Sequence, residues 1–149
     1  DKRFAPEVIA SVDQTITALV GKNMTPTIDL VGYSGGGAVA VLVAAQRRDV
    51  RSIRTIAGNL DHEAVNALHE VSRMAGSLNA IDVAGRVATI PQIHFSGSAD
   101  DIVPSSVAQR FLERAASPCV RTETVRGASH EEGWHVVWPA LLKHAPTCR

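Results

Sequence analysis

A serine, an aspartate and a histidine stand along this chain in an order that could support nucleophilic catalysis. Ser34 is the centre of a G-x-S-x-G sequence that runs from Gly32 to Gly36. Asp100 and Asp101, either of which could supply the carboxylate, lie in a polar stretch at 96–104, and His130 follows a Gly-Ala-Ser sequence. A serine hydroxyl is a weak nucleophile at neutral pH, so it needs a base to take its proton and a group to orient that base. A histidine and a carboxylate can supply those two functions.

The serine is placed between a predicted strand and a predicted helix. Apolar and β-branched residues indicate a buried strand over Thr27–Tyr33, and the apolar run Ala38–Ala45 indicates a helix that is buried nearly all round. A serine on such a sharp turn projects its hydroxyl above the sheet. The first free N–H groups of the helix would then stabilise an oxyanion. The structural alternative is a glycine turn in which Ser34 caps the helix.

Helical and strand patterns alternate along the rest of the chain. Apolar spacing predicts further helices over Arg3–Val20, Asp61–Arg73, Ser105–Ala116 and Trp134–His144, and further strands over Val50–Ala57, Ile90–Phe95 and Cys119–Val125. Residues 76–88 are expected to be irregular, and Arg47 and Arg48 place cations near the end of the Ala38–Ala45 helix. This alternation is typical of an α/β fold with a parallel sheet and helices on both faces. Ligands bind beyond the carboxyl ends of such strands, where all three candidate residues fall.

The three motifs together resemble the C-terminal part of an α/β-hydrolase, the superfamily of serine esterases and lipases. The nucleophile elbow of that family matches Gly32–Gly36, its acid loop matches Gly97–Pro104, and its histidine loop matches 127–130. The resemblance covers residues 27–142 and implies the α/β-hydrolase fold.

The resemblance also implies a catalytic triad of Ser34, His130 and Asp100, with the backbone N–H of Gly35 as one oxyanion donor. Such a triad would hydrolyse a small-molecule or lipid ester, a thioester or an amide through an acyl-enzyme, and no cofactor is implied. The alternative function is a non-catalytic member of the fold, or an inactive fragment, that serves as a binding module.

The pattern departs from the family in its number of strands. The family sheet has about eight strands, whereas four are predicted over 1–149. We therefore expect 1–149 to be one domain that is the C-terminal part of a larger protein, with the missing strands and the second oxyanion donor preceding Asp1. The strand at Thr27–Tyr33 would then be an apolar sheet edge. We expect it to pair with the missing N-terminal part or to self-associate.

Other residues compete for the same functions. Asp101 could replace Asp100 as the acid, and Asp61 is a further rival whose alternative role is a helix cap. Family spacing favours Asp100. His130 and His135 are one residue too far apart for an H-E-x-x-H zinc motif, so no metal site is expected. His62 and His69 share one helix face and are expected to face solvent or the mouth of a pocket.

Composition excludes several classes of function. The chain has 149 residues, of which 45% are apolar, and its 15 basic and 15 acidic residues balance. A neutral chain without basic tracts is not typical of a nucleic-acid-binding protein, and no apolar run is long enough to span a bilayer. Cys119 and Cys148 are either two separate thiols or a disulfide between the last strand and the C-terminal tail. A disulfide would favour a periplasmic or secreted protein.

Overall fold

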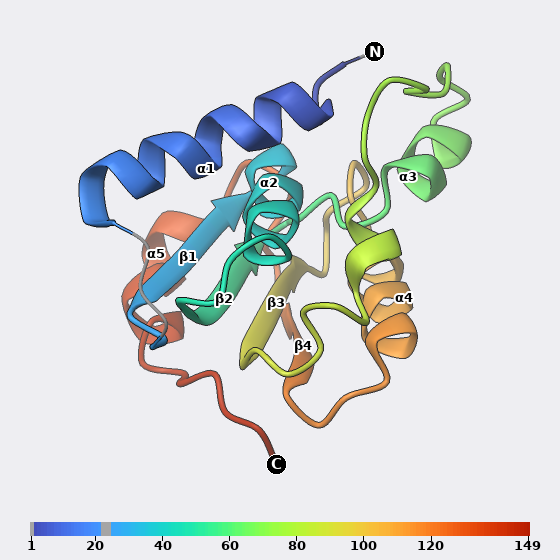
Figure 1. Cartoon of the computed structure of the whole chain (residues 1–149). Helices are drawn as coiled ribbons and strands as arrows, with labels where there is room; N and C mark the ends of the chain where they lie inside the picture. The colour runs from blue at the N-terminus through green and yellow to red at the C-terminus, as the bar shows by residue number, and fades with distance from the viewer. Residues whose placement is uncertain (1, 22–24) are drawn as a thin grey trace.

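Four parallel strands form a single sheet in the computed structural model, which describes residues 2–21 and 25–149 (Figure 1). The strands lie in the order β1-β2-β3-β4 and span Ile28–Tyr33, Val50–Ile56, Gln92–Gly97 and Val120–Val125. Ile56 pairs with Tyr33 on one side and with Phe95 on the other, while Gly97 pairs with Val125. The carboxyl ends of all four strands therefore meet at one edge of the sheet.

Helices cover both faces of this sheet. The helical segments are α1 (Pro6–Val20), α2 (Gly35–Ala44), α3 (His62–Leu68), the 3₁₀ turn η1 (Ala80–Val83), α4 (Ser105–Ala115) and α5 (Trp134–Leu141). One core joins α1, α2, η1 and α4 to the sheet around Ile9, Val41, Ile53 and Phe111. A second core packs α5 against the opposite face around Phe95 and Trp134. The prediction of a parallel α/β fold with helices on both faces is confirmed.

The predicted element boundaries differ from the structure mainly around α3. This helix ends at Leu68 rather than Arg73, because Glu70 adopts a left-handed backbone conformation with φ of 53°. The helix predicted from Arg3 begins at Pro6, where the proline occupies a first-turn position that needs no backbone donor. Residues 76–88 include the turn η1, although no regular element was expected there.

Cys119 and Cys148 form a disulfide, so the second of the two interpretations of the cysteines is correct. Cys119 immediately precedes β4, and the bond therefore ties the C-terminal tail to that strand. No helix among the described residues is both long and apolar enough to cross a membrane.

Arg47 joins α1 to the segment that follows α2 through a buried network of charges. Its guanidinium donates to both carboxylate oxygens of Asp49, at 2.8 and 2.7 Å, and to Asp13 at 2.7 Å. Its side chain is 1% exposed, and that of Asp49 is 2% exposed. Arg47 thus connects α1 to the residues after α2 and is buried, whereas a cation at a helix end is expected to be solvated.

Substituting Arg47 with Met is expected to lower the free energy of unfolding by about 3–5 kcal/mol, because it leaves buried carboxylates without their main cation. Urea unfolding followed by circular dichroism measures the change. The neighbouring Arg48 is exposed, so Arg48→Met is the matched control and is expected to stay within about 0.5 kcal/mol of the parent. Equal midpoints for the two variants would contradict this role for Arg47.

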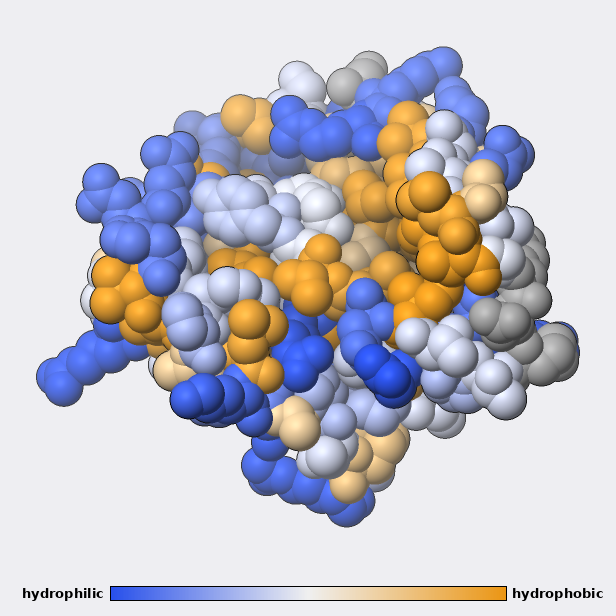
Figure 2. All heavy atoms as spheres, turned by 90° about the vertical axis from the view of Figure 1, so that its left-hand side faces the viewer, coloured by the Kyte–Doolittle hydropathy of each residue, from blue (hydrophilic) through white to orange (hydrophobic). Residues whose placement is uncertain are grey.

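β1 is an edge strand, and no strand of the described residues pairs with its outer side. Apolar residues gather on the face that contains this edge (Figure 2). A hollow of about 380 Å³ lies there between β1, β2 and α5, and its lining is Val31, Tyr33, Ile56, Trp134, His135 and Trp138. An unprotected apolar edge invites pairing with another chain.

We expect the purified protein to self-associate through this edge. Sedimentation velocity over a range of concentrations should show species larger than a monomer, and Val31→Lys should restore the monomer. Leu68→Lys is the matched control, because Leu68 is similarly exposed (57% against 51% for Val31) but lies on α3, away from β1. A monomer at every concentration of the parent protein would contradict the expectation.

Candidate active site

Ser34 occupies a strained turn between β1 and α2. Its backbone angles are φ 51° and ψ −122°, a region that residues with a side chain rarely adopt. Its N–H donates to the carbonyl of Ile56 at 2.9 Å, and its carbonyl accepts from Gly37 at 3.0 Å. Ser34 stands at the N-cap position of α2, but its side chain makes no capping hydrogen bond. The capping interpretation is therefore wrong for its hydroxyl group.

The glycines around Ser34 permit two backbone segments to approach closely. A Cβ on Gly32 would collide with the backbone of Gly36, so only glycine fits there. A Cβ on Gly37 would lie 3.0 Å from the Cα of Gly58, in the segment after β2. Gly35 is the first residue of α2, and its N–H has no acceptor within the helix.

The loops after β3 and β4 also meet closely above the sheet. Gly97 is the last residue of β3. A Cβ on it would collide with the carbonyl of Ala128, which lies in the loop after β4. The N–H of Ala99 donates to the same carbonyl at 3.0 Å. This contact brings Asp100 and His130 together although they are 30 residues apart.

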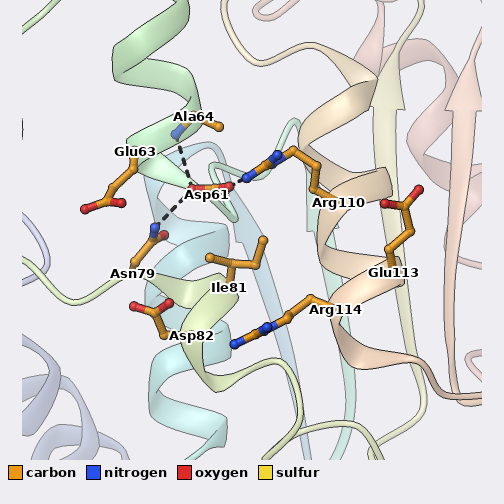
Figure 3. Close-up of a pocket in the computed structure, with 9 residues that line it drawn as sticks. All are labelled: Asp61, Glu63, Ala64, Asn79, Ile81, Asp82, Arg110, Glu113 and Arg114. Atoms are coloured by element: carbon orange, nitrogen blue, oxygen red, sulfur yellow. Dashed lines mark hydrogen bonds and ion pairs between the residues drawn. The ribbon is translucent and has the colours of Figure 1, made fainter.

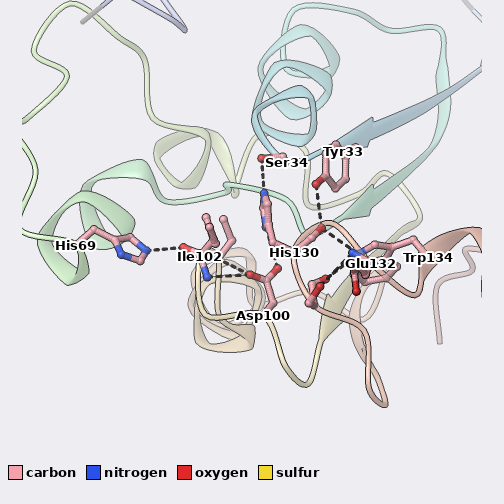
Figure 4. Close-up of polar contacts among 10 residues, drawn as sticks. Tyr33, Ser34, His69, Asp100, Ile102, His130, Glu132 and Trp134 are labelled. Carbon is pink, nitrogen blue, oxygen red and sulfur yellow. Dashed lines mark hydrogen bonds and ion pairs between the residues drawn. The ribbon is translucent and has the colours of Figure 1, made fainter.

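Ser34, His130 and Asp100 form a continuous chain of hydrogen bonds (Figure 4). The Oγ of Ser34 lies 3.0 Å from Nε2 of His130, and Nδ1 of His130 lies 3.0 Å from Oδ2 of Asp100. A carboxylate only accepts hydrogen bonds, so Nδ1 carries the proton and Nε2 accepts from the serine. This is the arrangement in which an imidazole can remove a hydroxyl proton.

Asp100 is held rigidly by its own loop. Its side chain is fully buried, and Oδ1 accepts from the N–H groups of Ile102 and Val103 at 3.0 and 2.8 Å. The carbonyl of Ile102 in turn accepts from Nε2 of His69 at 2.8 Å, which links α3 to this loop (Figure 4). Oδ2 is thereby directed at His130.

Neither alternative acid contacts His130. Asp101 is exposed. Asp61 caps α3 and accepts from the N–H of Ala64 at 3.2 Å, from Asn79 at 3.0 Å and from Arg110 at 2.9 Å. Burial raises the pKa of Asp61, but these hydrogen bonds outweigh burial and leave the pKa below its usual value.

A polar cavity of about 500 Å³ lies between α3, η1 and α4, and Asp61 lines it (Figure 3). The side chains that line this cavity carry both signs of charge. Asp61 in its wall already accepts hydrogen bonds from Asn79 and Arg110.

The other histidines have separate environments. His62 is buried beside Phe4, with ring centroids 5.9 Å apart, so the expectation that it faces solvent is wrong, whereas it does line a hollow of about 250 Å³ together with Leu78 and Arg86. The cause is the N-terminal segment, which packs over the start of α3. His69 is exposed, as expected. His94 is fully buried between Thr55 and Gln92, and burial lowers its pKa to about 3. Among the described residues no three metal-ligating side chains cluster.

Two aromatic residues hold the backbone of the histidine loop at the site. The hydroxyl of Tyr33 donates to the carbonyl of His130 at 2.9 Å, and Nε1 of Trp134 donates to the same carbonyl at 3.1 Å. Trp134 also donates to the carbonyl of Ser129 at 2.9 Å, so its ring is held against the histidine loop. Tyr33 occupies the variable position of G-x-S-x-G, so no motif could have identified its contact.

No protein-family model and no curated protein sequence matches this chain. Solved structures do match. An esterase of Pyrococcus furiosus has a TM-score of 0.72 at 16% identity, covering 93% of this chain and 59% of its own. A monoacylglycerol lipase of Paleococcus ferrophilus has a TM-score of 0.66 at 16% identity, covering 91% of this chain and 72% of its own.

An esterase domain from a Rhodothermus marinus protein matches with a TM-score of 0.62 at 24% identity, covering 83% of this chain. The chain spans only 58% of the length of that domain. Three structures that share this parallel sheet and its helices are thus an esterase, a lipase and an esterase domain. The chain has the α/β-hydrolase fold.

Proposed function

We propose that this chain carries the catalytic residues of a serine hydrolase that cleaves a carboxylic ester or thioester. The observation that carries the proposal is the hydrogen-bond chain from Ser34 Oγ through His130 to the buried Asp100, at 3.0 Å for each step. The strain at Ser34 supports it, because unfavourable backbone angles are typical of functional positions.

The reaction would proceed in two halves. His130 accepts the proton of Ser34 as Oγ attacks the carbonyl carbon, and then gives that proton to the departing alcohol or thiol. Asp100 keeps the imidazole in the required tautomer and stabilises its charged form. Water then attacks the acyl-enzyme, with His130 again acting first as base and then as acid, and the acid product leaves.

The oxyanion of each tetrahedral intermediate would be stabilised by the N–H of Gly35. This group lies at the start of α2, where the helix dipole also favours negative charge. We propose that residues 1–149 act as one domain of a larger α/β-hydrolase and that the second donor comes from outside them.

The proposed substrate is a small-molecule or lipid ester. The apolar hollow supports this class, since Tyr33, the residue next to Ser34 in the chain, lines it together with Val31, Ile56 and Trp138. The disulfide between Cys119 and Cys148 supports an oxidising compartment, either the periplasm or outside the cell.

Hydrolysis of p-nitrophenyl esters of increasing acyl length tests the proposal. We expect release of p-nitrophenol above the rate in buffer, with an initial burst that approaches one equivalent per chain when deacylation is slow. Ser34→Ala protein, purified in parallel, controls for contaminating esterases. A parent protein no faster than this control would contradict the proposal.

A further inference from the structure

The backbone carbonyl of His130 is held from two directions. Trp134, the first residue of α5, reaches it from four residues further along the chain and also donates to the carbonyl of Ser129 at 2.9 Å. Tyr33 reaches it across 97 residues of sequence, from the end of β1 (Figure 4). Of these two hydrogen bonds, the one from Tyr33 joins the histidine loop to the strand that ends next to Ser34.

This contact bears directly on the distance between the serine and the histidine. Tyr33 is adjacent to Ser34 in the chain, and its ring packs beside the imidazole of His130, with centroids 5.4 Å apart. The imidazole position depends on where the backbone of His130 lies. A bond from Tyr33 to that backbone therefore sets the 3.0 Å separation between Oγ and Nε2.

We infer that Tyr33 is a positioning residue that aligns His130 with Ser34 through its hydroxyl hydrogen bond. This inference rests on the proposed function. The hydrogen bond from Tyr33 to the histidine carbonyl joins the turn that holds the nucleophile to the loop that holds the base. A small error in the alignment of these two groups is costly for catalysis.

The role requires a protonated phenol, because only the O–H form can donate to a carbonyl oxygen. Burial raises the pKa of Tyr33, and the negative charges of Glu131 and Asp100 raise it further. The other titratable groups facing it are the rings of His130 and His135. Above that pKa the hydroxyl becomes a phenolate that cannot donate and that repels the carbonyl oxygen.

Tyr33→Phe tests the inference, because it keeps the ring and removes only the hydroxyl. We expect kcat to fall about tenfold while KM changes little, since one hydrogen bond that aligns the base is lost. Rates are expressed per active site titrated with a fluorophosphonate, which removes any unfolded fraction from the comparison. Thr15→Val is the control, because it removes a similar 2.9 Å hydroxyl-to-carbonyl bond on α1, remote from the site.

The alkaline pH dependence separates positioning from a merely structural role. Tyr33 is the only tyrosine in the chain, so near-ultraviolet absorbance follows its ionisation alone. We expect kcat of the parent to decline with the same midpoint as this absorbance, above pH 10, and the decline to be absent from Tyr33→Phe.

Three results would overturn the inference. If the parent is active and Tyr33→Phe has the same kcat, the inference fails while the proposed function stands. The same holds if the decline of kcat at alkaline pH persists in Tyr33→Phe. A parent that neither hydrolyses esters nor reacts with a fluorophosphonate overturns the proposed function, and this inference with it.

Discussion

Ser34→Ala is expected to lower kcat for ester hydrolysis by about a million-fold, the scale seen when the nucleophile of a triad is removed. Oγ is the only atom lost, and it is the atom 3.0 Å from Nε2 of His130. Without it no acyl-enzyme can form, and only the weak catalysis supplied by substrate binding and the oxyanion donor persists. Initial rates with a p-nitrophenyl ester, measured at high enzyme concentration, give the ratio.

Ser105→Ala is the matched control for this substitution. Ser105 is an exposed serine at the start of α4, so its substitution removes the same atom from a position outside the Ser34–His130–Asp100 hydrogen-bond chain. We expect its kcat to equal that of the parent. If Ser34→Ala kept more than about a thousandth of the parent rate, the nucleophile would have to lie elsewhere.

Asp100→Asn is expected to lower kcat by about 10⁴-fold while leaving the fold intact. An asparagine can still accept from the N–H groups of Ile102 and Val103 through its Oδ1. Its Nδ2 then replaces the oxygen that faces His130. Because Nδ2 donates, Nδ1 of His130 must become an acceptor and Nε2 must carry the proton. An Nε2–H cannot take the proton of Ser34, so the base is present but in the wrong tautomer.

The adjacent residue provides an unusually close control for Asp100. Asp101→Asn makes the same chemical change one position along the same loop, but its carboxylate is exposed and lies outside the hydrogen-bond chain. We expect this variant to retain the parent kcat. If the two variants lost activity equally, the loss would reflect general damage to the loop. If only Asp101→Asn lost activity, the acid would be assigned to the wrong residue.

Much of the fold could be predicted because its signals are local. Each strand and each amphipathic helix shows its own hydrophobic periodicity over a short stretch of sequence. The glycines around Ser34 indicate the sharp turn between a strand and a helix. The order of serine, aspartate and histidine, each just beyond a strand, was enough to predict that they meet at one sheet edge. The structure places them within hydrogen-bond distance there.

The remaining features depend on contacts between distant segments. The Tyr33 hydroxyl reaches His130 across 97 residues, and no spacing rule connects those positions. Arg47 is typical of a solvated helix-end cation, yet α1 brings Asp13 onto it and buries it. His62 lies under Phe4 for the same reason, since the packing of the N-terminal segment cannot be deduced from the α3 pattern alone. The end of α3 depends on the single left-handed residue Glu70.

The proposed function depends on Ser34 being an activated nucleophile, and intact mass after treatment with a fluorophosphonate shows whether it is. We expect one adduct per chain on the folded parent protein and none on Ser34→Ala. Peptide mapping should place the adduct on Ser34. A folded parent protein that gains no adduct, or a Ser34→Ala variant that gains the same adduct, would contradict the claim.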